Sequence, residues 1–317
     1  MTKPVNALSG AVVVGVSPAH PSRAAVRLGA LLARSHRATL VLVAVTSSAW
    51  PPLPTNRGAD SEFLEFATKQ AETALAEARS WLPESLDVST LVKGASSARR
   101  GLLEVCEEHD ALRLVVGARA EGAHHEIELG SVASSLMQSA HLPIAIAPHD
   151  YDVADDALIS RVTASYSGSE TSGELVLGAA ATAAKFGCGI RVASFHTRPR
   201  GFMESGVGLD VEDEVIAEWG AVIRQHVTQL LGDIEEFAAP PEVIDAAVGV
   251  GRQWHEALRA VDWLPGEVLL VGSTSLGPIA RVSLGSHAAK IVRHSPVPVV
   301  VVPRRATSNY VAQAKHA

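Results

Sequence analysis

Short apolar runs alternate with longer amphipathic segments along the chain. In the first half, aliphatic and β-branched residues fill 11–16, 39–45, 88–93, 113–117 and 143–147, which predicts strands at these places. Apolar positions recur with a helical period at 22–35, 61–81, 98–108 and 131–139. Strands that are apolar on both faces and joined by helices indicate a parallel sheet covered on both sides.

The same pattern occurs twice. VVVGVSPAHPSRAA at 12–25 aligns with VTASYSGSETSGEL at 162–175, and HDALRLVVG at 109–117 aligns with LPGEVLLVG at 264–272. The offset grows from 150 to 155 residues, which places five extra residues between the second and third strands of the second copy.

The repeat predicts an α/β fold of two tandem doubly wound domains, each a five-stranded parallel sheet with helices on both faces. We assign residues 1–150 to the first domain and residues 151–305 to the second, joined by a short acidic segment. Residues 306–317 have no periodic pattern and are expected to form a flexible tail.

Each copy contains one strand–loop–helix crossing, VGARAEGAHHEIELGS at 116–131 and VGSTSLGPIARVSLGS at 271–286. The crossing leaves the carboxyl edge of the sheet, where α/β folds bind ligands, and enters a helix whose first N–H groups attract anions. The alternative is that each glycine turns the chain and each serine caps its helix. Both interpretations stay open for the candidate site, which consists of Gly117, Arg119, Gly130, Ser131, Gly272, Gly285 and Ser286.

These crossings resemble those of the universal stress protein family, in its tandem two-domain form. The resemblance covers about residues 10–305, and 129–148 and 281–303 look like the family's last helix and strand. It implies a nucleotide site with the spacing Gly, two residues, Gly, nine residues, Gly-Ser or Gly-Thr. It also implies that the two domains pair as a pseudo-dimer through their last strands, at 143–147 and 298–302. A further homodimer is left open.

The chain departs from the family's pattern at matching places in both copies. The second glycine of the spacing is Ala120 in one copy and Ser275 in the other, and an aspartate expected after the first strand is Ser17 or Ser167. The added Cβ narrows the approach to a triphosphate, and a carboxylate for ribose or metal is lost. We therefore expect degenerate nucleotide sites that bind ATP at best at high micromolar concentration, the first being the stronger because Arg119 lies in its loop.

Charge and composition exclude several classes of protein. The chain has 317 residues and a formal net charge of −7, which argues against a nucleic-acid-binding surface. No apolar run reaches the length of a membrane span, and a cytoplasmic location is expected.

Other signals are weaker. His124, His125 and Glu126 are adjacent residues that rarely converge on one ion, so no metal site is expected. GVGRQW at 249–254 lacks the third glycine of a dinucleotide fingerprint and is expected to form a tight turn. Helical spacing predicts core packing for three tryptophans, Trp219, Trp254 and Trp263.

The sequence thus favours a non-enzymatic stress-response or regulatory protein without catalytic residues. The alternative is an ATP-binding switch or slow ATPase that uses the repeated loops. A nucleotide binder related to electron-transfer flavoproteins is disfavoured because a longer FAD-type domain is missing.

Overall fold

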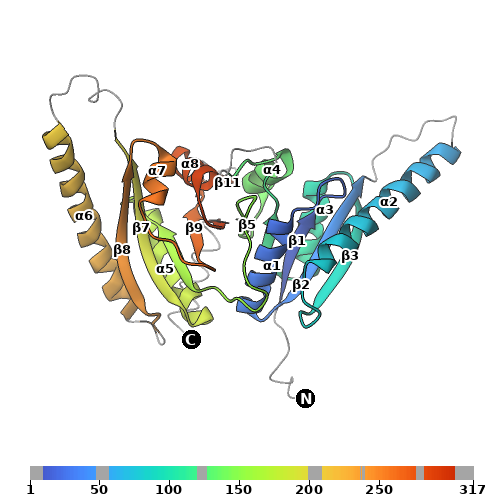
Figure 1. Ribbon diagram of the computed structural model, residues 1–317, viewed down its shortest axis with the longest axis horizontal. Coiled ribbons are helices and arrows are strands. Elements are labelled where there is room, and N and C mark those ends of the chain that lie inside the picture. The colour runs from blue at the N-terminus through green and yellow to red at the C-terminus, as the bar shows by residue number, and fades with distance from the viewer. Residues whose placement is uncertain are drawn as a thin grey trace, which may run out of the picture. The chain divides into compact units, whose positions relative to one another are not determined.

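The structure is a computed structural model that describes residues 10–47, 57–119, 127–198, 209–235, 237, 240–275 and 282–303. The chain divides into two compact units, Met1–Leu158 and Ile159–Ala317. Strands and helices alternate in both units (Figure 1), as the repeated pattern predicts.

The first unit contains one parallel sheet in the order β3-β2-β1-β4-β5. Its helices α1 and α2 follow the first two strands, and α3 packs with α4. Its elements are β1 (Ala11–Val16), α1 (Arg23–His36), β2 (Thr39–Ser47), α2 (Arg57–Ser80), β3 (Val88–Ala95), α3 (Ala98–Glu108), β4 (Ala111–Val116), α4 (Ser131–Ser139) and β5 (Ile144–Ile146).

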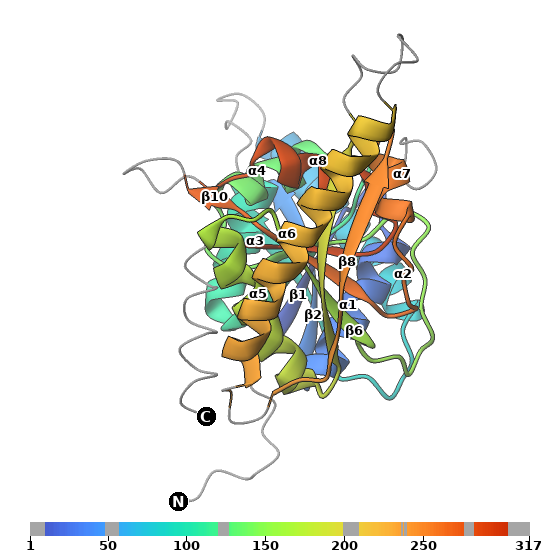
Figure 2. The same ribbon diagram turned by 90° about the vertical axis from the view of Figure 1, so that its left-hand side faces the viewer.

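The second unit repeats this topology with the strand order β12-β9-β6-β7-β8, again parallel. Helix α6 lies beside α5, as Figure 2 shows, and α7 packs with α8. Its elements are β6 (Arg161–Ser165), α5 (Glu170–Phe186), β7 (Gly189–Thr197), α6 (Leu209–Glu235), β8 (Val243–Gly251), α7 (Trp254–Arg259), β9 (Val268–Gly272), β10 (Thr274–Ser275), β11 (Val282–Ser283), α8 (Ser286–His294) and β12 (Val299–Val302).

The two tandem sheets confirm the predicted fold class, and the five extra residues lie where the repeat places them. Between Thr197 and Val243 there are 45 residues, whereas between Ser47 and Val88 there are 40. The longer crossover carries α6, a peripheral helix, so the core strands keep their register.

Burial explains why the strands are apolar on both faces. The side chains of Val12, Val13 and Val14 are fully buried in β1, and Leu28 and Leu31 of α1 are fully buried as well. Fully burying one such side chain contributes about 1.5–3 kcal/mol. The hydrophobic cores on the two faces of each sheet therefore hold the strand ends in fixed positions.

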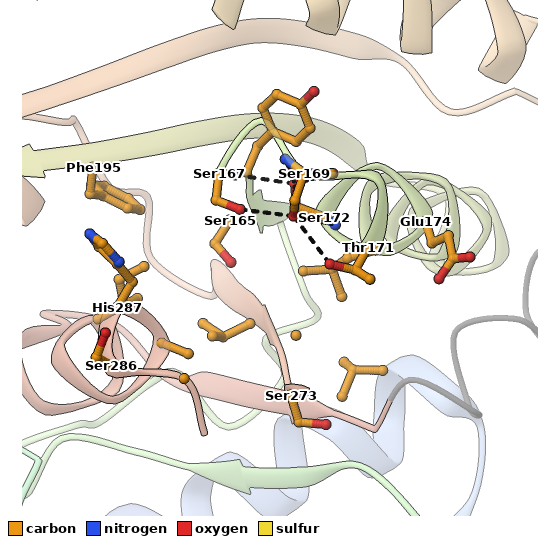
Figure 3. A pocket seen from close by; sticks show the side chains of 18 of the residues that line it. Ser165, Ser167, Ser169, Thr171, Ser172, Glu174, Phe195, Ser273, Ser286 and His287 are labelled. Atoms are coloured by element: carbon orange, nitrogen blue, oxygen red, sulfur yellow. Dashed lines mark hydrogen bonds between the residues drawn. The ribbon is translucent and has the colours of Figure 1, made fainter. Parts of the chain in front are cut away.

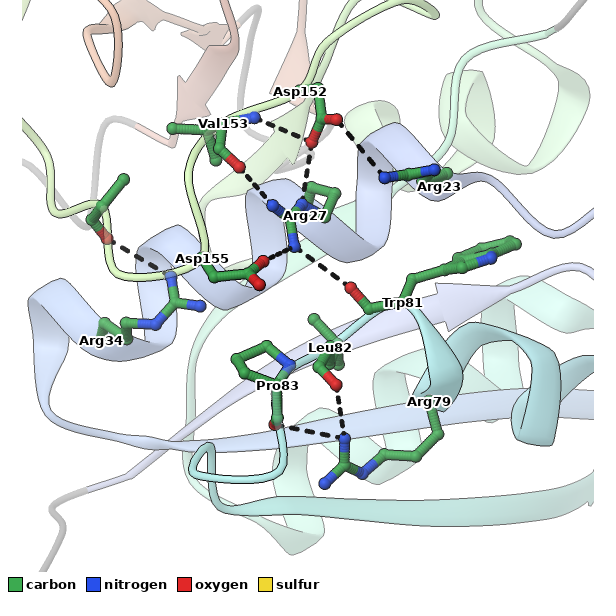
Figure 4. A network of polar contacts seen from close by, with 11 residues as sticks. Arg23, Arg27, Arg34, Arg79, Trp81, Leu82, Pro83, Asp152, Val153 and Asp155 are labelled. Carbon is green, nitrogen blue, oxygen red and sulfur yellow. Dashed lines mark hydrogen bonds and ion pairs between the residues drawn. The ribbon is translucent and has the colours of Figure 1, made fainter.

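Residues 151–158 belong to the first unit, although the sequence assigns them to the second domain. Arg27 of α1 holds this segment in place (Figure 4): its Nε donates to Asp152 Oδ1 at 2.9 Å, and its Nη atoms bind the Asp155 carboxylate and the Val153 carbonyl. The Arg27 side chain is only 8% exposed. The connecting segment thus supplies the partners of a nearly buried guanidinium, a relation that local sequence patterns do not reveal.

Replacing Arg27 with alanine is expected to release residues 151–158 and to lower the free energy of unfolding of the first domain by about 1–3 kcal/mol, since hydrogen bonds to a charged group are lost. Limited proteolysis of the full chain should then cut within this segment, and denaturant unfolding gives the stability change. Arg23→Ala is the matched control because Arg23 is exposed and reaches Asp152 only at 3.5 Å. Equal protease resistance in both variants would contradict the prediction.

Candidate functional site

A cavity of about 520 Å³ lies in the second unit, at the carboxyl ends of β6, β7 and β9. Its walls also include the starts of α5 and α8 and part of α6. Side chains from these elements converge on it in Figure 3. Ligands of α/β folds bind at this edge of the sheet, so the cavity is the candidate site.

Hydroxyl groups gather on the α5 side of the cavity (Figure 3). The Ser169 hydroxyl accepts from the backbone N–H of Ser172 at 3.3 Å, and Ser172 Oγ accepts from the backbone N–H groups of Ser169 and Ser167 at 3.1 and 3.2 Å. The hydroxyl of Thr171 lies 3.1 Å from that of Ser169. Ser167, at the family's aspartate position, lies 3.1 Å from Ser169 Oγ. This side of the cavity therefore offers neutral hydroxyls where a carboxylate was expected from the family.

Two further hydroxyls in the cavity wall are buried. Ser165 ends β6 and is 9% exposed, and Ser273 follows β9 and is 8% exposed. Neither hydroxyl belongs to the fully buried polar atoms that lack a partner among the described residues, and both residues line the cavity. Both groups are thus available to hydrogen-bond a molecule in the cavity.

The start of α8 lines the cavity between Gly285 and Ala288. Gly285 is the N-cap, and no side chain caps the helix. The first intrahelical bond runs from the N–H of Ala289 to the carbonyl of Gly285, so the three preceding N–H groups lie before it. Such a helix start binds anions, including phosphate.

The interpretation of the crossing serines as N-cap residues is wrong in both copies. Gly130 and Gly285 occupy the N-cap positions, and neither helix has a side-chain cap hydrogen bond. Ser131 and Ser286 are the first helical residues, which leaves their hydroxyls free of a capping role. The physical reason is that the non-helical backbone conformation that precedes a helix falls on each glycine, one residue earlier than the serine.

Two neighbouring aromatic rings also line the cavity. The ring of His196, at the end of β7, lies 4.9 Å from the Trp219 ring of α6, and both residues line the cavity. Burial, and then the charge of His287, lower the pKa of His196 below its usual range. His287 meets Trp254 edge-on at 5.3 Å. Trp219 was expected in the core, but it is half-buried and lines the cavity.

The candidate residues of the second copy come together here. Gly272, Gly285 and Ser286 all line the cavity, and a Cβ added at Gly272 would meet only Leu175, at 3.6 Å. Ser275 belongs to β10, which pairs with β11 at the base of the loop.

The candidate residues of the first copy lie at corresponding places. A Cβ at Gly117 would come within 2.8 Å of Ser22 Cβ, so packing of a neighbouring side chain requires this glycine. A Cβ at Gly130 would lie 3.5 Å from Arg119 Cγ, which places the Arg119 stem at the start of α4. Residues 120–126, with Ala120 and the adjacent His-His-Glu, lie outside the described residues. Which of the two sites binds more strongly stays a prediction.

Sequence reasoning missed most of the cavity wall. The missed residues come from different strands and helices and form no motif: Ser165, Glu174, His196, Trp219, Ser273 and His287. For Ser165, His196 and Ser273, the available signal was a position at or just after the end of an apolar strand. Among the described residues, no group of three or more His, Cys, Asp or Glu side chains is arranged to hold a metal ion. No helix within the described ranges is both long and apolar enough to cross a membrane.

The fold and the cavity define a tandem α/β protein with a cavity at the carboxyl edge of a parallel sheet. The model of the Universal stress protein family matches residues 10–148 and again residues 159–303. The chain therefore belongs to the universal stress protein family and carries two of its domains.

Known proteins match this chain over most of its length. The universal stress proteins Rv2319c of Mycobacterium tuberculosis and Mb2346c of Mycobacterium bovis are each 32% identical to this chain, over 92% of it and 99% of their own length. A universal stress protein structure from Archaeoglobus fulgidus has a TM-score of 0.58 at 17% identity and covers 92% of this chain and 98% of its own. A putative universal stress protein from Pseudomonas aeruginosa has a TM-score of 0.54 at 13% identity, with 98% of both chains covered. These two structures share the fold.

Proposed function

We propose that the protein is a non-enzymatic, cytoplasmic stress-response protein whose second domain binds a nucleotide as a regulatory ligand. The observation that carries the proposal is the cavity at the sheet edge, where the open start of α8 lies among hydroxyl groups. The hydroxyls of Ser165 and Ser273, two residues of the cavity wall, supply two hydrogen-bond partners. A phosphate fits the helix start, and a base fits the Trp219 side of the cavity.

Weak binding of ATP is part of this proposal. The helix start contributes about 1–2 kcal/mol toward an anion, whereas micromolar affinity requires about 8 kcal/mol. Ser167 replaces the carboxylate that would hold ribose or a metal. We therefore propose dissociation constants in the high micromolar range, with degenerate sites in both domains.

The described cavity leads us to propose that the second domain is the stronger binder, against the sequence expectation based on Arg119. Titration calorimetry with ATP and AMP, with and without magnesium, tests this on the full chain. Ser286→Ala should weaken binding several-fold, because its hydroxyl lies at the cavity, and the matched Ser131→Ala should change it less. If Ser131→Ala weakens binding more than Ser286→Ala does, the first domain contains the stronger site. Bound ATP that survives gel filtration would contradict the weak affinity.

A slow ATPase is the second candidate, because the carboxylate of Glu174 and the imidazole of His196 line the same cavity. Either group is a chemically suitable proton acceptor for an attacking water. Phosphate release from ATP decides between the candidates. If the wild type hydrolyses ATP, and Glu174→Gln abolishes this hydrolysis without changing ATP binding, the non-enzymatic proposal is overturned.

A further inference from the structure

Two histidines distinguish the second-domain cavity from the corresponding place in the first domain. His196 ends β7, and His287 is the second residue of α8. The internal repeat aligns them with Thr46 and Val132, using the offsets of 150 and 155 residues. The common fold therefore does not require imidazoles at these places, and their shared position at the cavity calls for a separate explanation.

The surroundings of the pair limit its charge. The other titratable side chains of the described cavity wall are Tyr166, at the end of β6, and Glu174 on α5. Burial raises the pKa of Tyr166, which keeps its phenol neutral. Of the charged neighbours, His287 is the one that shifts the pKa of His196, and it adds to the effect of burial. Both influences disfavour a proton on His196 as long as no anion is bound in the cavity.

We propose that His196 and His287 form an anion subsite that selects phosphorylated ligands and takes up a proton when such a ligand binds. The inference rests on the proposed nucleotide site and specifies how that site recognises charge. A phosphate in the cavity that both imidazoles line offsets their mutual repulsion and compensates for the desolvation of His196. The open N–H groups of α8 direct the same anion toward His287.

The direction of the pH dependence follows from linkage. The anion raises the pKa of His196, which lies below its usual value of about 6.5 in the free protein. Affinity is then highest below the pKa of the free protein, falls as the pH rises toward the pKa of the complex, and is constant above it. Each unit of difference between the two pKa values changes the affinity about tenfold.

The test is titration calorimetry of the full chain with 5′-AMP at pH 6.5, in two buffers of different ionisation enthalpy. This measures the protons taken up on binding. The phosphate of AMP itself titrates near pH 6, but it contributes equally to all variants. The wild type should take up more protons than His196→Asn, and its affinity should rise about three- to tenfold more between pH 8 and pH 6. The control is His141→Asn, an exposed residue of the first domain, which should match the wild type.

The outcomes separate the two proposals. Equal proton uptake by the wild type and His196→Asn, with AMP bound to both, overturns the proton-linked subsite and leaves the nucleotide site intact. No binding of AMP by folded wild-type protein at any pH overturns the nucleotide site itself. If His196→Asn does not fold, His287→Asn replaces it, because His287 is exposed. That variant should also lose most of the preference for AMP over adenosine, and an unchanged preference contradicts the inference.

Discussion

Replacing Glu267 with alanine is expected to destabilise the second domain by about 3–5 kcal/mol, the usual cost of removing one partner of a buried ion cluster. The Glu267 side chain is fully buried and accepts from Arg161 Nη2 and Arg191 Nη2, each at 2.6 Å. The Thr163 hydroxyl donates to it as well. Both arginine side chains are less than one-tenth exposed, so the substitution leaves two buried guanidinium groups without their carboxylate.

Denaturant unfolding of the full chain measures this effect, with the transition of the first domain as an internal reference. Glu235→Ala removes an exposed carboxylate from the end of α6 and should change stability by less than about 0.5 kcal/mol. A loss below about 1 kcal/mol for Glu267→Ala would show that water or rearranged side chains neutralise the arginines.

The first domain supplies an apolar replacement for the whole cluster. The repeat aligns Arg161, Arg191 and Glu267 with Ala11, Val41 and Leu112. Replacing a complete buried ion cluster with apolar residues is often neutral or stabilising. The triple variant carrying the residues of the first domain should therefore recover most of the stability that Glu267→Ala loses. If the triple variant is as unstable as Glu267→Ala, lost packing rather than unpaired charge is the cause.

Hydrophobic patterns in the sequence do not predict the buried ion cluster. Hydrophobic periodicity predicts β6, β7 and β9 well, because most of their residues are apolar and buried. It does not reveal that Arg161 and Arg191, which lie in β6 and β7, share one buried partner. Their common partner lies more than 70 residues away along the chain, and only the parallel arrangement of the strands brings the three together.

The residues of the candidate site, too, could be predicted from the sequence only in part. Local spacing identifies the glycines and serines of the crossing, and in the second unit they do line a cavity. It does not identify His196 or Ser165, since each is a single residue at the end of a strand. Local spacing also does not show whether the glycine or the serine is the N-cap residue, because the two alternatives differ only by a one-residue shift of the helix start.

GVGRQW is a second place where the local interpretation holds only in part. The segment was expected to form a tight turn, and the chain does bend at 252–253 before α7 begins, but Gly249 and Gly251 lie within the strand β8. A Cβ built on Gly249 would lie 2.1 Å from the carbonyl oxygen of Ala257, and one on Gly251 would lie 2.5 Å from its nitrogen. The two glycines therefore allow the backbone of α7 to approach the strand closely.

Gly249→Ala is accordingly expected to cost the second domain about 3 kcal/mol, at the upper end of the range for overpacked sites, because the clash involves backbone that cannot rotate away. The displaced α7 carries Trp254, whose ring contacts His287 at the cavity. The variant should therefore also weaken nucleotide binding under conditions in which the protein is still folded. Denaturant unfolding and titration calorimetry on the same sample measure the two effects.

Gly232→Ala is the matched control for this substitution. Gly232 lies inside α6, and a Cβ added there would have no heavy atom within 4 Å. Alanine has the higher helix propensity, so this variant should gain about 0.5–1 kcal/mol. Opposite signs for the two glycine-to-alanine changes would show that close approach of α7, rather than a general backbone effect, explains Gly249. A stability of Gly249→Ala within about 0.5 kcal/mol of the wild type would mean that α7 moves aside without loss of packing, and nucleotide binding should then be unchanged as well.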